Sequence, residues 1–306
     1  MKKLRVALLR GGFSAERQVS IKTGDMIAKN LDKKKYQVFL FDPAKDLIKL
    51  ANLLNRKKID VVFPALHGPL GEDGAIQGML EVFGVPYVFS GVLASALAMD
   101  KEMSKKIFKK EKIPIPKYFI FTKNNHISLK KVEFPCVVKP LTQGSSIGVT
   151  IVQKPSEFKK ALKKALDFGP RVMVEEFIEG REITVAVLGN KKVKALPLIE
   201  IKPKTSQFFD YQAKYEVGGS EEICPAPINQ ILTKKIQELA IKTHLALGCR
   251  GVTRTDLILH SSQPFILEIN TIPGMTKTSL VPQAAREAGI NFQQLLDRLI
   301  ELALEK

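Results

Sequence analysis

The chain has 306 residues, of which 45% are hydrophobic and 26% charged, so its size and composition are those of an ordinary globular protein with about two domains. No run of eighteen apolar residues occurs, which argues against a membrane-spanning helix, and the apolar run after Met1 is too short for a signal peptide. The net charge of +17 is the outlier; because the lysines form short runs without interleaved aromatics or zinc-finger spacing, it favours a lysine-rich proteome and anionic small substrates over nucleic acid.

The number and spacing of the cysteines indicate the redox state of the cell compartment in which the protein works. There are three of them, Cys136, Cys224 and Cys249, and they are far apart in the sequence. An odd number at such spacing does not favour a disulfide framework, so we expect a protein of the reducing cytoplasm.

The first predicted strand, residues 4–9, ends in a turn that contains Gly11-Gly12, and a helix is expected over residues 19–30. A glycine pair lets backbone approach a ligand closely, and a helix N-terminus favours an anion. The turn lacks GxGxxG, so a plain strand-to-helix connection fits it as well. Glu16 in this turn is unusual, since its carboxylate could instead bind a substrate ammonium group.

Strands and helices then alternate, which predicts a parallel sheet with helices on both faces. Ligands of such sheets bind at the carboxyl ends of the strands, which places His67 on the same edge as Glu16. A direct role and a purely structural one both remain open for this histidine. The sequence favours strands at 36–41, 59–66 and 85–89, helices at 46–54, 75–83 and 93–112, and a proline-rich linker at 113–116.

A second part of the chain begins with strands at 118–121 and 136–139. The latter ends at Lys139 and leads into a glycine- and serine-rich loop, residues 140–148, before a strand at 149–152. Backbone amides and hydroxyls of such a loop could fold over phosphates, with Lys139 supplying charge. It is not a Walker A motif, because no GK[ST] follows, and a flexible hairpin is the alternative.

Further along, residues 155–157 are expected to cap a helix that runs to about residue 167, and a strand follows at 172–174. Glu175 and Glu182 bracket a segment where strand becomes loop. Its backbone could hydrogen-bond a purine while a carboxylate binds ribose hydroxyls, although solvated charges would give the same pattern. A hairpin is predicted between residues 184–188 and 193–198.

Residues 202–222 lack apolar periodicity but contain several aromatic side chains. A loop of this length in a compact domain is usually functional, so we interpret it as a lid that excludes water from a site. Amphipathic helices are expected at 230–247 and at 291–305.

The most informative stretch is a predicted hairpin that carries Arg254, Asp256, Glu268 and Asn270. If it is symmetric about Ser262, Asp256 faces Glu268 and Arg254 faces Asn270, and all four side chains project from one side. Carboxylates directly opposite each other, roughly 4.5–5.5 Å apart at Cβ, repel unless a cation lies between them.

The donors in this hairpin are all oxygen, which favours Mg²⁺ or Mn²⁺ over Zn²⁺. Magnesium held by few protein oxygens completes its shell with water and nucleotide phosphate, which indicates phosphoryl transfer. An exposed hairpin with scattered charges is the alternative. The adjoining Pro-Gly loop, residues 271–276, offers backbone donors beside the carboxylates and favours the metal interpretation.

Taken together, these motifs resemble the D-alanine–D-alanine ligase family of the ATP-grasp superfamily. They occur in the family's order and cover nearly the whole chain. The matching segments are residues 11–16, 67–74, 99–101, 139 with 144–146, 210–215, 254–256 and 268–280.

The resemblance implies a function and a fold. The function would be ATP-dependent ligation of two D-alanine molecules through an acyl phosphate, for cell-wall precursor synthesis, by a cytoplasmic enzyme that forms a homodimer and binds neither nucleic acid nor membrane. The fold would be α/β (α+β), with a Rossmann-like parallel-sheet domain at 1–95, a central ATP-grasp subdomain at 96–182, and a C-terminal ATP-grasp subdomain with metal site and lid at 183–306.

The resemblance also implies a role for each matching residue. Two Mg²⁺ (or Mn²⁺) ions would be held by Asp256, Glu268 and Asn270. ATP would contact Lys101, Lys139, Ser146, Glu175, Glu176, Ile178, Glu182 and Lys214. The first D-alanine would meet Glu16 and His67, the tetrahedral oxyanion Arg254 and the Gly274 amide, and the second D-alanine Ser279 and Leu280, while Ser145 and Tyr215 would anchor the lid and orient the incoming amine.

Two departures from the family pattern stand out. Glu176 occupies a position where some relatives have lysine, and Phe209 one where tyrosine is common. Tyr215 favours a dipeptide product over D-alanyl-D-lactate. Another ATP-grasp carboxylate-amine ligase is the nearest alternative, and a basic nucleic-acid-binding protein that merely retains the fold is a more distant one.

Overall fold

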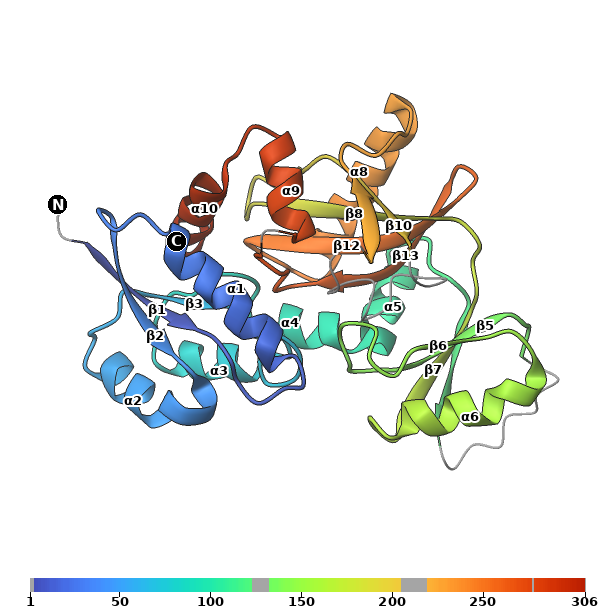
Figure 1. Ribbon diagram of the computed structural model, residues 1–306, viewed down its shortest axis with the longest axis horizontal. Helices are drawn as coiled ribbons and strands as arrows, with labels where there is room; N and C mark the ends of the chain where they lie inside the picture. Colours follow the sequence, from blue (N-terminus) through green and yellow to red (C-terminus); the bar gives the residue numbers. More distant parts are fainter. Residues whose placement is uncertain (1–2, 123–131, 205–218, 277, 306) are drawn as a thin grey trace.

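The computed structural model describes residues 3–122, 132–204, 219–276 and 278–305. It contains three sheets, and Figure 1 shows them as three lobes around the central helices α4 and α5. A parallel sheet followed by two antiparallel ones confirms the predicted fold class. No helix in the described part of the chain is long and apolar enough to cross a membrane.

The first sheet is parallel, in the order β2-β1-β3, and its strands are β1 (Leu4–Leu9), β2 (Tyr36–Phe41) and β3 (Val61–Pro64). Alternate residues of β1 point to opposite faces, as a strand requires, so Val6 and Leu8 join one core and Ala7 and Leu9 another. Three helices connect its strands or follow them: α1 (Arg17–Asn30), α2 (Pro43–Asn55) and α3 (Ala75–Val82).

The fourth strand predicted at residues 85–89 is wrong. The segment makes a single parallel bridge, Tyr87 to Val62, with backbone bonds from Val62 N–H to Pro86 and from Val88 N–H to Val62. Pro86 has no N–H to donate, and Phe89 turns the chain with a φ of 76°. Both features stop the ladder from extending.

The single helix predicted at 93–112 is also wrong, because it is two helices, α4 (Val92–Met99) and α5 (Lys101–Lys110). Asp100 has extended backbone, and its carboxylate accepts hydrogen bonds from Glu102 N–H and Met103 N–H at 2.9 and 3.0 Å. An aspartate that caps the following helix in this way necessarily ends the preceding one.

The second sheet is antiparallel, in the order β4-β7-β5-β6, with α6 (Pro155–Leu166) on one face. Its helix cap differs from the prediction. Lys154 is the N-cap residue, without a side-chain cap bond, while Glu157 accepts a bond from Gln153 N–H. The strands are β4 (Tyr118–Thr122), β5 (Cys136–Pro140), β6 (Thr150–Val152) and β7 (Arg171–Glu176).

The third sheet has the order β11-β10-β8-β12-β13, with β9 paired to β8. On one face of this sheet, α8 (Gln230–Ala246) packs together with α4 and α5. On the other face, α9 (Leu280–Glu287) and α10 (Phe292–Leu304) share a core with the first sheet. Figure 1 shows α10 beside α1. The strands are β8 (Arg181–Leu188), β9 (Lys194–Ala195), β10 (Ile199–Pro203), β11 (Ser220–Ile223), β12 (Val252–His260) and β13 (Gln263–Asn270).

Several sequence expectations for this sheet need correction. The hairpin between β8 and β9 pairs only two positions, Val187 with Ala195 and Leu188 with Lys194. The ends of the stretch 202–222 are strands, since β10 and β11 pair Lys202 with Glu221. Helix α9 was not predicted. The rest of the expected lid, residues 205–218, lies outside the described residues.

Candidate active site

The hairpin of β12 and β13 has the predicted pairing at its polar positions. Asp256 lies opposite Glu268 and Arg254 opposite Asn270. Beyond Asp256 the register shifts by one residue, so that Leu257 pairs with Ile266, and the turn tightens to Ser261-Ser262. Because the bulge lies beyond Asp256, the two polar pairs keep the register that was predicted from the sequence.

Asp256 is buried and its carboxylate is held from two sides. Arg254 binds it through two nitrogens, Nε at 2.9 Å and Nη2 at 2.7 Å, and the Thr184 hydroxyl donates to it at 2.6 Å. Thr184 lies directly opposite on β8. Sequence reasoning missed this threonine, because an alternating strand gives no sign of which strand it will pair with.

Glu268 and Asn270 complete the donor set. Glu268 lies 3.2 Å from the Lys101 ammonium and keeps 29% of its side chain exposed, so it is open to a ligand. The Asn270 carbonyl oxygen accepts a bond from Ile272 N–H at 2.9 Å. Two carboxylates and one amide on paired strands suit a hard divalent cation such as Mg²⁺. Among the described residues no cluster of three His, Cys, Asp or Glu competes with this site.

Opposite the hairpin, the second sheet contributes a buried ionic cluster. Both Glu175 carboxylate oxygens are bound by ammonium groups, Oε1 by Lys105 at 2.5 Å and Oε2 by Lys139 at 2.6 Å. Burial alone would raise the pKa of Glu175, but the two lysines outweigh it and the pKa is lowered. The sequence had associated Glu175 with the nucleotide's adenine and ribose, and that role stays a prediction; in the structure the carboxylate pairs with the two lysines.

Lys105 was also missed by sequence reasoning. A lysine inside an amphipathic helix normally indicates a solvated face, yet this one is completely buried. The available signal was spacing, since Lys105 follows Lys101 by one helical turn and so shares its face of α5.

A cavity of about 140 Å³ separates the hairpin from the second sheet. It brings together all seven described residues that the sequence assigned to the nucleotide, and two of the metal donors also line it. The predicted nucleotide and metal residues that line this cavity are Lys101, Lys139, Ser146, Glu175, Glu176, Ile178, Glu182, Asp256 and Glu268.

A second cavity, of about 220 Å³, adjoins the first, and the two share Lys101, Gln143 and Glu268. It collects the described residues that the sequence assigned to the amino-acid substrates. These are Glu16, His67, Ser145, Arg254, Gly274, Ser279 and Leu280, and Asn270 lies among them.

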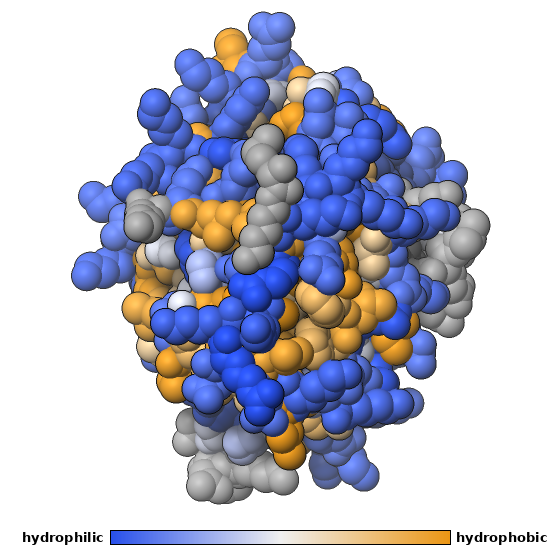
Figure 2. Space-filling view, turned by 90° about the vertical axis from the view of Figure 1, so that its left-hand side faces the viewer, coloured by the Kyte–Doolittle hydropathy of each residue, from blue (hydrophilic) through white to orange (hydrophobic). Residues whose placement is uncertain are grey.

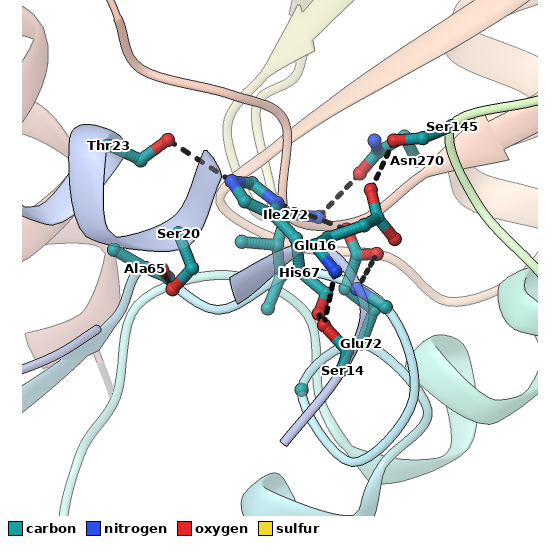
Figure 3. Close-up of polar contacts among 12 residues, drawn as sticks. Ser14, Glu16, Ser20, Thr23, Ala65, His67, Glu72, Ser145, Asn270 and Ile272 are labelled. Atoms are coloured by element: carbon teal, nitrogen blue, oxygen red, sulfur yellow. Dashed lines mark hydrogen bonds and ion pairs between the residues drawn. The ribbon is translucent and has the colours of Figure 1, made fainter. Parts of the chain in front are cut away.

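Glu16 lies at the centre of a polar network in this second cavity (Figure 3). It is the N-cap residue of α1 and is buried, and its carboxylate accepts a hydrogen bond from the Ser145 hydroxyl. The bond joins the turn after β1 to the loop after β5. Ser145 and Ser146 have φ values of 51° and 58°, a left-handed backbone that side chains rarely adopt, so the loop is held in a strained shape.

His67 is buried beside Glu16 and is fixed by its neighbours. Its Nε2 lies 3.1 Å from the Thr23 hydroxyl and its Nδ1 lies 3.8 Å from Glu72. Glu72 in turn accepts a bond from Gly68 N–H at 2.8 Å. Figure 3 shows the ring between Thr23 and Glu16. Both the structural and the substrate-facing interpretations of His67 are therefore compatible with its position.

The far wall of the second cavity is the start of α9. Ser279 is its N-cap residue and Leu280 its first residue. The Ser279 hydroxyl is 2.8 Å from both the backbone N–H and the hydroxyl of Thr276. The N-terminus of a helix carries partial positive charge, which suits a carboxylate at this wall.

Two predicted site residues, Lys214 and Tyr215, lie outside the described residues. Their predicted roles therefore stay predictions. The same holds for the effect of having phenylalanine rather than tyrosine at Phe209, which also lies outside the described residues.

Comparison with known proteins gives one consistent family. The family model "D-ala D-ala ligase C-terminus" matches residues 107–301, and "D-ala D-ala ligase N-terminus" matches residues 42–90. The chain is 50% identical to a D-alanine–D-alanine ligase of Syntrophobacter fumaroxidans, covering 99% of this chain and 98% of the relative, and 48% identical to one of Desulforamulus reducens, covering 99% of each.

Solved structures agree. A D-alanine–D-alanine ligase from Bacillus anthracis complexed with ATP superposes with a TM-score of 0.86 at 36% identity, covering 98% of this chain and 97% of that one. The VanG D-Ala:D-Ser ligase from Enterococcus faecalis superposes with a TM-score of 0.85 at 32% identity, covering 99% and 100%.

Proposed function

The chain belongs to the D-alanine–D-alanine ligase family, and we propose that its two adjoining cavities are the nucleotide and D-alanine sites of that reaction. The enzyme joins two D-alanine molecules with the hydrolysis of ATP to ADP and phosphate. The observation that carries the site assignment is the meeting of the cavities at Lys101 and Glu268, since phosphoryl transfer requires the nucleotide and the accepting carboxylate to be in contact.

The nucleotide site is the cavity between the second and third sheets. Lys101 and Lys139 supply positive charge for the phosphates, and the backbone of residues 175–178 faces the base. Ser146 lines this cavity from the strained loop. Glu182 also lines this cavity, and we assign it to the ribose hydroxyls, as the family resemblance implies.

Asp256, Glu268 and Asn270 would hold Mg²⁺ or Mn²⁺, with two ions per site as the family resemblance implies. Bound there, divalent cations neutralise the charge of the terminal phosphates. The donor chemistry and the open face of Glu268 support this assignment.

The reaction would then proceed as the family resemblance implies. The γ-phosphoryl group passes to a carboxylate oxygen of the first D-alanine, giving ADP and an acyl phosphate. The amine of the second D-alanine attacks the carbonyl carbon, the bond from that carbon to the phosphate oxygen breaks, and the amine loses a proton as the amide forms. Glu16 binds the first ammonium group, with His67 beside it.

Arg254 and the Gly274 amide would stabilise the oxyanion of the tetrahedral intermediate, because both line the substrate cavity next to the metal donors. Ser279 and Leu280 at the start of α9 would receive the carboxylate of the second D-alanine. Ser145, through its bond to Glu16, keeps the two sides of the cavity together.

A direct test measures ADP formation with D-alanine, D-serine, D-lactate and L-alanine, and identifies the product by mass spectrometry. We expect D-alanine to give D-alanyl-D-alanine. A preference for D-serine as second substrate would indicate a D-Ala:D-Ser ligase, the activity in the name of the Enterococcus faecalis structure. Turnover with L-alanine alone would contradict the assignment of the substrate cavity.

We also propose that the chain is organised as residues 1–95, 96–182 and 183–306, since each part contains most of one sheet. A homodimer through the first part is supported by its surface. Eight of the thirteen exposed large apolar side chains found among the described residues lie there. They are Phe13, Leu40, Leu47, Ile48, Leu70, Val82, Val92 and Leu93.

Figure 2 looks at this end of the molecule and shows apolar surface between hydrophilic groups. Exposed apolar patches of this kind mark interaction sites. Light scattering tests the dimer, and a monomer at micromolar concentration would contradict it. A reducing cytoplasm, which the three free cysteines support, is the proposed location.

A further inference from the structure

Lys105 is the one charged side chain among the largest fully buried side chains of the described residues. It extends from α5 to the second sheet, where its ammonium lies 2.5 Å from Glu175 on β7 and 5.9 Å from the centre of the Tyr118 ring on β4. A buried lysine is costly unless it is paired. The role of Lys105 should therefore be sought in its partner, Glu175.

That partner is shared with a residue of the nucleotide cavity. Glu175 binds Lys105 through one carboxylate oxygen and Lys139 through the other. Lys139 lines the cavity, whereas Lys105 is completely buried. The carboxylate thus connects a lysine that can touch a ligand to one that cannot.

The charges in this cluster do not cancel. Two ammonium groups face one buried carboxylate, so among these three side chains one positive charge is in excess, beside the nucleotide cavity. Burial lowers the pKa of Lys105 to about 8, with Glu175 opposing that shift and Lys139 adding to it.

Helix α5 also ties this cluster to the metal side of the site. Lys101, one turn earlier, reaches Glu268 at 3.2 Å and the Gln143 carbonyl at 2.7 Å. Phe108, one turn later, is fully buried in the core of the third sheet. The helix therefore contacts both sheets that enclose the nucleotide cavity.

We infer that Lys105 is a positioning residue of the ATP site, which fixes Glu175 from behind so that Glu175 holds Lys139 against the phosphates. The inference rests on the proposed role of Lys139 in binding ATP. Lys105 contacts no ligand and acts through two other side chains. Without it, Glu175 would keep only its pair with Lys139, and the position of the Lys139 ammonium would be fixed less tightly.

A double-mutant cycle tests this chain of contacts, because residues that act through one another are not additive. The variants are Lys105→Met, Lys139→Met and the double variant, and the readouts are the KM values for ATP and for D-alanine. We expect Lys105→Met to raise the KM for ATP about tenfold while the KM for D-alanine changes less than twofold. In the Lys139→Met background the same change should raise the KM for ATP less than twofold.

Lys105→Met leaves Glu175 paired with Lys139, so the fold is expected to persist, and Lys105→Gln keeps a hydrogen-bond donor if the methionine variant does not fold. Lys109→Met is the matched control, since Lys109 lies one turn further along α5 and is exposed. It should leave both KM values unchanged.

The outcomes separate the two assignments. If Lys139→Met leaves the KM for ATP unchanged, the proposed role of Lys139 fails. If Lys139→Met raises it but the folded Lys105 variant does not, or if the two effects multiply independently, the positioning role of Lys105 is overturned. Equal rises in the KM values for ATP and D-alanine would also overturn it, because they indicate a general structural defect.

Discussion

The Ser145 hydroxyl donates a hydrogen bond to the Glu16 carboxylate across 129 residues of sequence. This one contact joins the turn of the parallel sheet to the serine loop of the second sheet, and it lies in the cavity that holds the proposed D-alanine residues. The first substrate's ammonium group therefore meets a carboxylate whose orientation depends on a distant loop.

Ser145→Ala should lower kcat/KM for D-alanine by about 10- to 100-fold, because a hydrogen bond to a charged group contributes about 1.5–3 kcal/mol. Ser146→Ala is the control in the same loop. Ser146 lines the nucleotide cavity, so its loss should act on the KM for ATP. Steady-state kinetics with each substrate varied decides between them; equal effects of both variants on D-alanine would contradict the assignment of the two cavities.

Gly68→Ala should weaken D-alanine binding without removing a polar group. Gly68 has a φ of 72°, and a Cβ there would lie 2.7 Å from Glu16 Oε2. The added methyl group must displace Glu16, so we expect the KM for D-alanine to rise about tenfold, a change of about 1.4 kcal/mol.

Gly78→Ala is the matched control for that change. Gly78 lies within α3, and no atom lies within 4 Å of the position of its Cβ. Alanine there should stabilise the helix by up to about 1 kcal/mol and leave the kinetics unchanged. Normal D-alanine kinetics in Gly68→Ala would show that Glu16 is not held against the substrate.

His244 predicts a pH dependence of stability. Its ring is buried against Thr253, with Nδ1 2.8 Å from the Thr253 hydroxyl, and burial lowers its pKa from 6.5 to about 4. The unfolded chain therefore binds a proton that the folded chain does not, so this contribution is complete above pH 6.5 and is lost as the pH falls toward 4.

Urea unfolding followed by circular dichroism at pH 7 and pH 4.5 measures this loss. Between these values the wild type should lose about 2 kcal/mol more unfolding free energy than His244→Gln. His260→Gln is the control, because His260 is exposed. Parallel pH curves for wild type and His244→Gln would contradict the buried neutral ring.

The three cysteines should be free and slow to react. Burial raises the pKa of Cys136 and of Cys224 to about 11 and that of Cys249 to about 12, so very little thiolate exists at pH 7.5. Iodoacetamide should label the native protein slowly and the urea-unfolded protein three times without reductant. Fewer than three labels after unfolding would indicate a disulfide that the structure does not have.

The pairing of the central hairpin was predictable because its polar residues alternate on both strands about a clear turn. Asp256 and Glu268 are opposite each other as expected. The register shift beyond them was not predictable, since the apolar residues on either side fit both registers. Most strands and helices of the first part were predicted by their alternation of apolar runs and turns.

Other features depended on contacts that sequence patterns do not encode. Lys105 has the residue type of a solvated helical lysine, and its spacing from Lys101 shows only that the two share a helix face; the contact with Glu175 from another sheet, which the sequence does not show, accompanies its burial. The break between α4 and α5 follows from Asp100 acting as a cap within an otherwise continuous helical pattern. Thr184 donates a hydrogen bond to Asp256 because β8 pairs with β12. The two residues are 72 apart in sequence, so no local pattern connects them.

The central claim is that Asp256, Glu268 and Asn270 hold a divalent cation against the terminal phosphates of ATP. Glu268→Gln keeps the shape of the side chain and removes its charge, so the most direct measurement is D-alanine-dependent phosphate release by this variant over a range of Mg²⁺ concentrations, with thermal unfolding as the check on its fold. The account predicts a loss of turnover of at least about 100-fold at saturating ATP, the scale on which removal of one transition-state charge contact acts, with an unfolding temperature close to that of the wild type. Near-normal turnover by the folded variant at the same Mg²⁺ concentration would contradict it.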